Sequence, residues 1–295
     1  LNGALLENTF VLLVSILNRL PVFLVGKPGS SKSLSMELIN SNLRGKDSKD
    51  DYFKTLPHIH KLGYQGSENA RADGIERVFE KAGRYGDDRR DHALPVILLD
   101  EIGLAEVSHH NPLKVLHALL ETDAFEDFQK RGGAQLGYAV VGISNWKLDA
   151  SKMNRAIYLA RPDPSPDDLI VTAQSIYESI NSAAMLDSDK SLLCLLANVY
   201  SEKTRDATVR QELRSFHGLR DFYSMVKEVA TKRKEALIER GHVCQAVARN
   251  FAGLPEAFFQ DLDLKDRPRA SERNFCNKVY KDKPITNDKL PPISA

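Results

Sequence analysis

The chain has 295 residues, enough for two modest domains or for one large domain with an appended lid. Its 42% hydrophobic and 27% charged residues are typical of a globular protein. A formal net charge of +1 offers no basic field for nucleic acid or an anionic membrane, so we expect no direct nucleic-acid binding. Three widely separated cysteines exclude a disulfide scaffold and a cysteine-rich zinc module within this chain.

The most apolar run, from Phe10 to Leu17, stops at two polar residues and then meets Pro21. A helix that crosses a bilayer needs about 20 apolar residues, so we expect no transmembrane segment. Because the first residue is leucine and not methionine, we expect the chain to be a fragment of a longer protein.

Helical and strand patterns alternate over the first half of the chain. A densely apolar helix is expected over 8–19, and further helices over 32–43, 68–81 and 113–120. Short apolar runs predict strands at 22–25, 96–99, 138–144 and 156–159, and we expect a further strand at 58–64. The charged stretch 83–92 is expected to be a loop. Apolar strands that alternate with helices indicate an α/β fold, a five-stranded parallel sheet between two helical layers.

The pattern changes after Arg161, where three prolines fall within five residues. Only helical patterns follow, over 167–180, 189–202, 204–213, 219–240 and 243–251. Ser165, Pro166 and Asp168 have the order of an N-cap, a first-turn proline and a capping carboxylate. We therefore expect an α/β core over 1–162, an all-helical lid over 163–255 and a tail or linker over 256–295.

A glycine- and serine-rich segment lies between the first strand and the second helix, where a phosphate-binding loop belongs. It reads Gly26-Lys27-Pro28-Gly29-Ser30-Ser31-Lys32-Ser33. Small residues let successive backbone N–H groups turn toward phosphate oxygens, and a helix N-terminus adds positive charge. Lys32 would reach the β- and γ-phosphates, and the Ser33 hydroxyl would ligate magnesium. The usual pattern has glycine where Ser31 stands, so we expect an effect of this serine on affinity.

Two later strands end in polar residues suited to the same chemistry. Asp100 and Glu101 close the strand at 96–99, 68 residues after Lys32. Asp100 would hold magnesium through water, and Glu101 would act as the general base on the attacking water. Asn145 follows the next strand and would orient that water. A chance asparagine in a turn after the strand stays open as the alternative.

Together these residues resemble the AAA+ ATPases, which have a P-loop, a Walker B Asp-Glu pair, a sensor-1 asparagine and a helical lid. The resemblance implies Mg-ATP as the ligand. It also implies that Arg155 is an arginine finger serving a neighbouring module, and that Arg220 is the sensor-2 arginine of the lid. A solvated surface charge or an ion pair stays open as the alternative for each arginine.

The resemblance can be narrowed to the mysterin family of giant RING-type ubiquitin ligases, in particular the fourth module of their dynein-like AAA+ array. The stretches that carry it are Gly26–Leu34, Tyr64–Ser67, Leu99–Glu106, Ser144–Trp146 and Gly218–Phe222. It implies nucleotide contacts along 26–34 and coupling to adjacent AAA+ modules of the same longer chain. It also implies a link to the ubiquitination machinery through the parent protein, in the cytoplasm or at lipid droplets. The cysteines needed for RING chemistry are absent from this chain.

Two other functions stay open beside ATP hydrolysis. One is a module that holds ATP without hydrolysing it and acts as a structural switch. The other is a freestanding remodelling ATPase of the MoxR or McrB kind that forms a ring. Trp146, next to Asn145, is expected to pack in the core.

Overall fold

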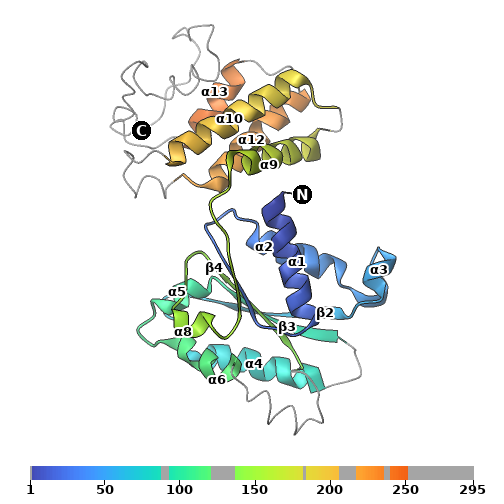
Figure 1. The fold of residues 1–295 in the computed structure, drawn as a ribbon, viewed down its shortest axis with the longest axis vertical. Coiled ribbons are helices and arrows are strands. Elements are labelled where there is room, and N and C mark those ends of the chain that lie inside the picture. The colour runs from blue at the N-terminus through green and yellow to red at the C-terminus, as the bar shows by residue number, and fades with distance from the viewer. Residues whose placement is uncertain are drawn as a thin grey trace. The chain divides into compact units, whose positions relative to one another are not determined.

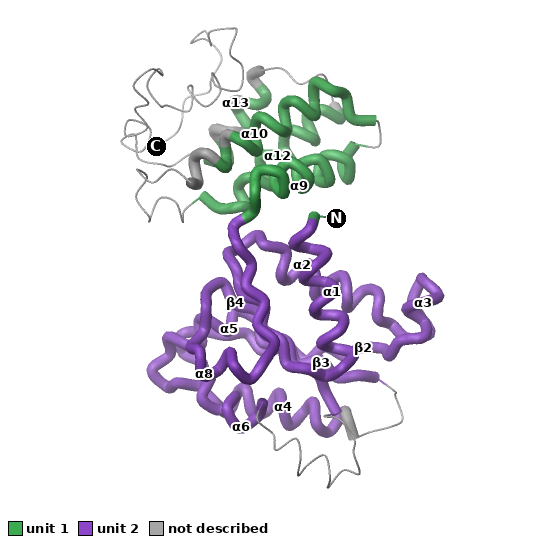
Figure 2. Tube along the Cα trace, viewed as in Figure 1, with its two compact units in different colours: residues 1–2, 164–295 green, residues 3–163 purple. Residues whose placement is uncertain are grey.

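A computed structural model of the chain describes residues 2–87, 93–120, 137–181, 184–205, 217–235 and 240–251. The chain divides into two compact units, coloured separately in Figure 2. One, the core unit, comprises residues 3–163. The other, the helical unit, comprises residues 1–2 and 164–295. The predicted tail at 256–295 and most of the helix predicted at 204–213 lie outside the described residues.

The core unit is built on a five-stranded sheet with the strand order β2-β3-β4-β1-β5 (Figure 1). Every neighbouring pair of strands is parallel, which confirms the predicted α/β fold. The strands are β1 (Val22–Val25), β2 (His58–Gln65), β3 (Ala93–Asp100), β4 (Ala139–Ser144) and β5 (Ile157–Ala160). The first and third of these are buried along most of their length, as expected for parallel strands covered on both faces.

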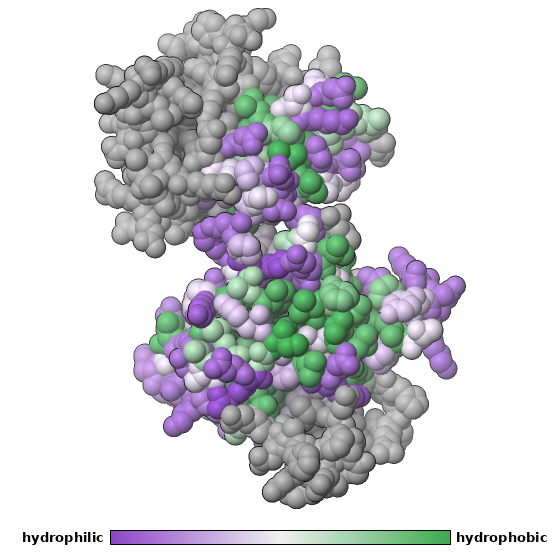
Figure 3. Space-filling model, in the orientation of Figure 1, coloured by the Kyte–Doolittle hydropathy of each residue, from purple (hydrophilic) through white to green (hydrophobic). Residues whose placement is uncertain are grey.

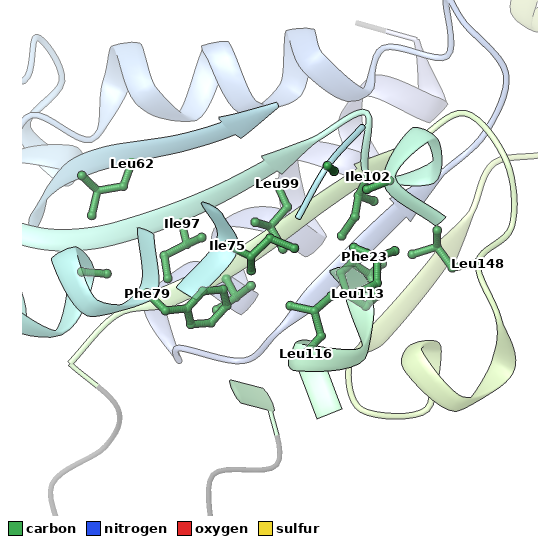
Figure 4. Packing of buried hydrophobic residues seen from close by; sticks show 14 of the residues in the cluster. Phe23, Leu62, Ile75, Phe79, Ile97, Leu99, Ile102, Leu113, Leu116 and Leu148 are labelled. Carbon is green, nitrogen blue, oxygen red and sulfur yellow. The ribbon is translucent and has the colours of Figure 1, made fainter. Parts of the chain in front are cut away.

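Alternate strand residues feed two separate hydrophobic clusters. On one face, Leu24 and Val96 pack with α1 (Gly3–Leu17) and α2 (Lys32–Asn42). On the other face, Phe23 and Ile97 pack with residues of α4 (Ala72–Asp87), α5 (Ile102–Glu106) and α6 (Leu116–Leu120), as Figure 4 shows. The two-residue period of the strands therefore divides the core into two layers.

Several element boundaries differ from the sequence prediction. The helix predicted at 68–81 begins at Ala72, and the helix predicted at 113–120 is the 3-10 turn η2 (Pro112–Val115) followed by α6. The first helix begins at Gly3 and not at residue 8. The stretch predicted as a loop from residue 83 is helical as far as Asp87. There Arg84 pairs with Glu80 one turn earlier, and the Tyr85 ring lies 4.8 Å from that of His60 on the edge strand β2. These contacts extend α4 into a charged stretch that shows no apolar periodicity.

Several short elements of the core unit escaped the sequence analysis. They are the 3-10 turn η1 (Gly45–Asp47) and the helices α3 (Asp51–Lys54), α5 and α8 (Ala150–Met153). Each has five residues or fewer, too few to show a helical period.

The helix α1 carries an exposed apolar stripe formed by Leu6, Phe10 and Val14. Figure 3 shows apolar side chains gathered where α1 runs in Figure 1.

The helical unit contains α9 (Pro166–Ile180), α10 (Asp187–Arg205), α12 (Leu219–Glu235) and α13 (Arg240–Phe251). The predicted start of α9 is confirmed, because Ser165 and Asp168 form a reciprocal capping box with Pro166 in the first turn. The hydrophobic core of the helical unit includes Phe222 and Tyr200, whose rings stack with centroids 4.9 Å apart. Among the described helices, none is long and apolar enough to cross a membrane.

Candidate active site

The glycine- and serine-rich loop turns sharply between β1 and α2. Gly29 has φ +89°, a conformation open to glycine. Ser31, the residue before Lys32, has φ +62° and ψ +15°, in the left-handed region that non-glycine residues rarely adopt. The usual glycine of the P-loop pattern is therefore replaced by a serine that keeps the backbone conformation of glycine.

The side chain of Lys32 is folded into this loop, with the residue only 5% exposed. Its Nζ donates to the carbonyl oxygens of Gly26 at 2.5 Å and Lys27 at 3.0 Å, and to the Ser30 hydroxyl at 3.2 Å. An ammonium held mainly by loop carbonyls can exchange these acceptors for phosphate oxygens. The loop is thus a cradle for an anion whose cationic group is already inside it.

Two hydrogen bonds and one ion pair hold the loop to the rest of the core unit. The Gly26 N–H donates to the carbonyl of Ser144 at the end of β4, at 3.1 Å. The Lys27 ammonium pairs with Asp163 at 2.7 Å, and both side chains are largely exposed. Asn8 on α1 is fully buried and donates to the Ser30 carbonyl at 3.1 Å. Asn8 and Asp163 carry no recognisable motif, so the sequence analysis did not identify them.

The end of β3 presents the two predicted acids side by side. Asp100 closes the strand, and its carboxylate accepts a hydrogen bond from the Glu101 N–H at 2.9 Å. Glu101 adopts φ +48°, left-handed, directly before the first residue of α5, and its side chain makes no capping hydrogen bond there. Its carboxylate accepts a hydrogen bond from Gln65 Nε2 at 2.7 Å. Gly66 follows Gln65 and approaches so closely that an added Cβ would overlap the Glu101 carbonyl oxygen.

Asn145 stands directly after β4, the strand between β1 and β3 in the sheet, and is half-buried. The expectation that the next residue, Trp146, packs in the core is wrong, because Trp146 is 42% exposed. Atoms Cε2 and Nε1 of its indole lie so close to Gly103 that a Cβ added there would overlap them. The Ser144 hydroxyl donates to the Trp146 carbonyl at 2.5 Å and fixes this turn. The loop, the Asp100–Glu101 pair and Asn145 thus share the carboxyl edge of the sheet, where α/β folds bind ligands.

Arg155 lies two residues after α8, on a segment joined to α5 by a buried ion pair. Lys152 and Glu106 are 2.8 Å apart, with side chains only 10% and 20% exposed. The same Glu106 oxygen accepts from the Asp149 N–H at 2.9 Å. Arg155 is half-buried, and its guanidinium donates to the Ser151 carbonyl. The Ser151 hydroxyl also donates to Asp149 and, with the Lys152 charge, lowers the pKa of that carboxyl.

Comparison with known proteins decides the family. A family model described as "RNF213 AAA domain" matches residues 1–168. The chain belongs to this family. It is 38% identical over 296 residues to the E3 ubiquitin-protein ligase rnf213-beta of Danio rerio, covering 95% of this chain and 6% of that protein. It is 36% identical over 273 residues to the E3 ubiquitin-protein ligase RNF213 of Homo sapiens, covering 91% of this chain and 5% of that protein.

The assignment to the RNF213 AAA domain family confirms the resemblance to a module of giant AAA-bearing ubiquitin ligases. The chain spans about one-twentieth of the length of these relatives, so it corresponds to a small part of them. Among solved structures, domain III of the Thermotoga maritima replication initiation protein DnaA has 11% identity and a TM-score of 0.48. That match covers 85% of this chain and 94% of the other, and it is too weak to add to the assignment.

The RNF213 AAA domain also offers oxygen ligands that fit magnesium. Ser33 is exposed in the first turn of α2, and Asp100 is half-buried at the end of β3. A hydroxyl and a carboxylate are the hard donors that magnesium binds together with phosphate oxygens. Leu34, next to Ser33, is 46% exposed, so the start of α2 is open on this side.

Arg220, the remaining predicted residue, belongs to the helical unit. It is exposed in the first turn of α12. The carboxylate of Asp221 accepts from the Gly218 N–H at 2.9 Å and so caps the same turn. Of the predicted site residues, all within the described part of the chain, Arg220 alone lies outside the core unit.

Proposed function

We propose that this RNF213-family module binds Mg-ATP and hydrolyses it. The observation that carries the proposal is the burial of the Lys32 ammonium among loop carbonyls at the carboxyl edge of a parallel sheet. Burial of a charge is costly, and here it leaves the cation in a cradle whose ends are fixed to α1 and β4. Asp100 and Glu101 end a strand at the same edge.

The roles of the residues follow from where they stand. Lys32 would exchange its loop carbonyls for the β- and γ-phosphates, with the N–H groups of 29–33 completing the cradle. Ser33 and Asp100 would hold the magnesium ion, which neutralises phosphate charge when bound. Glu101 would accept a proton from the attacking water, and Asn145 would orient that water.

Nucleotide binding and single-turnover hydrolysis of labelled ATP test the proposal. We expect Lys32→Ala to lose ATP binding, because the phosphates lose their cation. We expect Glu101→Gln to bind ATP as the unmodified chain does and to lose hydrolysis, because an amide cannot accept the proton. Lys61→Ala, an exposed lysine change on β2, serves as the control. The proposal is contradicted if the unmodified chain does not bind ATP.

One observation favours the alternative of an ATP-bound switch. The Gln65 amide occupies a carboxylate oxygen of Glu101, so this hydrogen bond must be broken before that oxygen can accept a proton from water. Tight ATP binding without turnover in the unmodified chain would support the switch. An arginine from a neighbouring module could also be needed, since such a finger contributes about 10³–10⁵ to rate where it has been measured.

Coupling to neighbouring modules is part of the proposal. Arg155 would serve the nucleotide of an adjacent AAA+ module, and Arg220 would report nucleotide from the helical unit. This chain matches only 6% and 5% of the length of its relatives, which favours a module within a long single chain over a freestanding ring-forming protein. Light scattering with and without ATP distinguishes them, because an ATP-dependent hexamer of this chain would support the ring. A role in ubiquitination through the parent protein, and a location in the cytoplasm or at lipid droplets, stay predictions.

A further inference from the structure

Asn8 is a buried polar residue whose hydrogen bonding is half complete. The side chain on α1 has no exposed surface, and its Nδ2 donates to the carbonyl oxygen of Ser30 at 3.1 Å. Its Oδ1 is buried without a hydrogen-bond partner among the residues that the structure describes. A buried acceptor without a partner costs free energy, so an apolar residue would serve packing at least as well. The remaining contact, to the loop, is the one feature that needs an asparagine here.

The bond to Ser30 controls the direction of the next N–H group. A trans peptide is planar, and its carbonyl and N–H point in opposite directions. Since Asn8 holds the Ser30 carbonyl toward α1, the N–H of Ser31 points away from α1. A rotation of this peptide would change both the direction of that N–H and the φ angle of Ser31.

The φ angle of Ser31 is energetically unfavourable for a residue other than glycine. Ser31 lies at φ +62°, where the Cβ of a non-glycine residue is crowded against the backbone. Glycine would adopt this conformation freely, but serine gains by leaving it. A restraint on the preceding peptide opposes that escape. The Ser30 N–H donates to the Lys27 carbonyl at 3.3 Å and the Ser30 hydroxyl to the same carbonyl at 2.8 Å, so the loop before Ser31 is already closed.

We propose that Asn8 is a positioning residue that compensates for the missing glycine at position 31. Its amide holds the Ser30–Ser31 peptide in the orientation that a phosphate cradle requires, although Ser31 is strained there. The inference rests on the proposed function for its effect on ATP, but the coupling between Asn8 and Ser31 exists without nucleotide. The neighbouring Glu7 pairs with Arg161 just after β5, so α1 is also held to the sheet one residue before Asn8.

A double-mutant cycle tests the compensation directly. In the chain with Ser31, we expect Asn8→Ala to weaken ATP binding about tenfold, as a lost hydrogen bond of about 1.4 kcal/mol would. In the Ser31→Gly chain we expect Asn8→Ala to weaken binding threefold or less, because glycine needs no restraint. The same cycle is measured without nucleotide by thermal unfolding. There Asn8→Ala should lower the Tm by about 2–4 °C more in the chain with Ser31 than in the Ser31→Gly chain.

Two further variants separate positioning from packing. Asn8→Leu keeps the branched arrangement of side-chain heavy atoms, at a somewhat larger volume, and removes the partnerless acceptor. It should therefore unfold at a higher Tm than Asn8→Ala and still bind ATP about tenfold more weakly than the unmodified chain. Ser15→Ala is the matched control, since Ser15 is also buried on α1, and its hydroxyl has no partner among the described residues. It lies seven residues, or about 10 Å, farther along the helix. It should leave ATP affinity unchanged.

The outcomes distinguish this inference from the proposed function. Equal losses from Asn8→Ala in the chain with Ser31 and in the Ser31→Gly chain, in affinity or in Tm, would overturn the compensation. Unchanged ATP affinity in both Asn8 variants would overturn it as well. If the unmodified chain does not bind ATP, the proposed function fails, and the Tm cycle still decides whether Asn8 and Ser31 are coupled.

Discussion

The side chains of Gln65 and Glu101 are joined by a hydrogen bond of 2.7 Å, although 36 residues separate them in the sequence. The bond links the last residue of β2 to the residue after β3, two strands paired in register from His58 to Gln65. It occupies an oxygen of the carboxylate that we propose as the general base. The access of water to that oxygen therefore depends on a neighbour outside the predicted Asp100–Glu101 pair.

Removal of the Gln65 amide should raise the hydrolysis rate. We expect Gln65→Ala to increase single-turnover ATP hydrolysis about threefold to tenfold with ATP affinity unchanged, because the amide no longer occupies the oxygen that must accept the proton. A hydrogen bond to a charged group contributes about 1.5–3 kcal/mol, and the exposure of this one to water lowers the expected gain. Lys61→Ala, on the same strand, should leave the rate as it is. A lower rate in Gln65→Ala would show instead that the amide holds Glu101 in its working position.

Loss of one partner of the buried Lys152–Glu106 ion pair should destabilise the fold strongly, whereas replacement of both partners should destabilise it little. We expect Lys152→Met alone to lower the free energy of unfolding by about 3 kcal/mol, since it leaves a buried carboxylate without its cation. Adding Glu106→Gln should restore most of that loss, as measured by urea denaturation. The exposed pair of Lys54 and Asp51 provides the contrast: Lys54→Met should change stability little. Equal effects at the two lysines would contradict the prediction.

Gly142 in β4 should tolerate no side chain. An added Cβ would overlap Cδ1 of Phe23, whose ring is enclosed in the core. We expect Gly142→Ala to lower the free energy of unfolding by about 2 kcal/mol or more, because the ring has no free volume into which to move. At Gly63 in β2 an added Cβ would meet no atom of the described residues within 4 Å, so Gly63→Ala should be neutral or stabilising. Chemical denaturation of both variants checks the difference.

The helical unit should lose stability at alkaline pH through Tyr177. Burial, together with the hydrogen bond to Asp189, raises the pKa of Tyr177 to about 12 from an ordinary value of about 10. Between these pH values the unfolded tyrosine loses its proton and the folded one keeps it, so the free energy of unfolding falls as pH rises from about 10 to 12. Below pH 10 this contribution is fully present.

Tyr177→Phe should flatten that pH dependence. At neutral pH it should cost about 1–2 kcal/mol, because Asp189 loses the 2.7 Å bond from the tyrosine hydroxyl while keeping Arg233 at 3.0 Å. Unfolding followed across alkaline pH, with tyrosinate absorbance as a second signal, measures both effects. A slope equal to that of the unmodified chain would mean that another group, such as Tyr223, whose burial also raises its pKa to about 12, dominates.

The sequence predicted features set by neighbouring residues, such as strands and a helix cap, and it did not predict contacts between residues far apart in the chain. Four of the five strands were identified because each is a short apolar run; β2, which was also predicted, contains polar residues. The capping box of α9 was identified because Ser165, Pro166 and Asp168 are close together in the sequence. Short helices such as α5 and α8 escaped because so few residues show no period. Trp146 was misplaced because its hydrophobicity predicts burial, whereas its ring lies on the surface against Gly103.

The contacts that hold the candidate site together could not be read from patterns. Asn8 and Ser30 are 22 residues apart, and Lys152 and Glu106 are 46 apart. Nothing in the residues around Asn8 marks it as a partner of the loop, because its role arises only when α1 packs beside α2. Ser31 shows the converse: the sequence marked it as a departure, and only the backbone angle shows that the left-handed conformation of glycine is retained.

The ion pair between Lys27 and Asp163 makes one attachment of the glycine- and serine-rich loop sensitive to ionic strength. Asp163 is the last residue of the core unit, so the pair joins the loop to the end of that unit. Both side chains are largely exposed, and dissolved ions screen such a pair. The buried hydrogen bond from Asn8 to Ser30 is shielded from that screening, so added salt should weaken the attachment at Lys27 and leave the one at Ser30 unchanged.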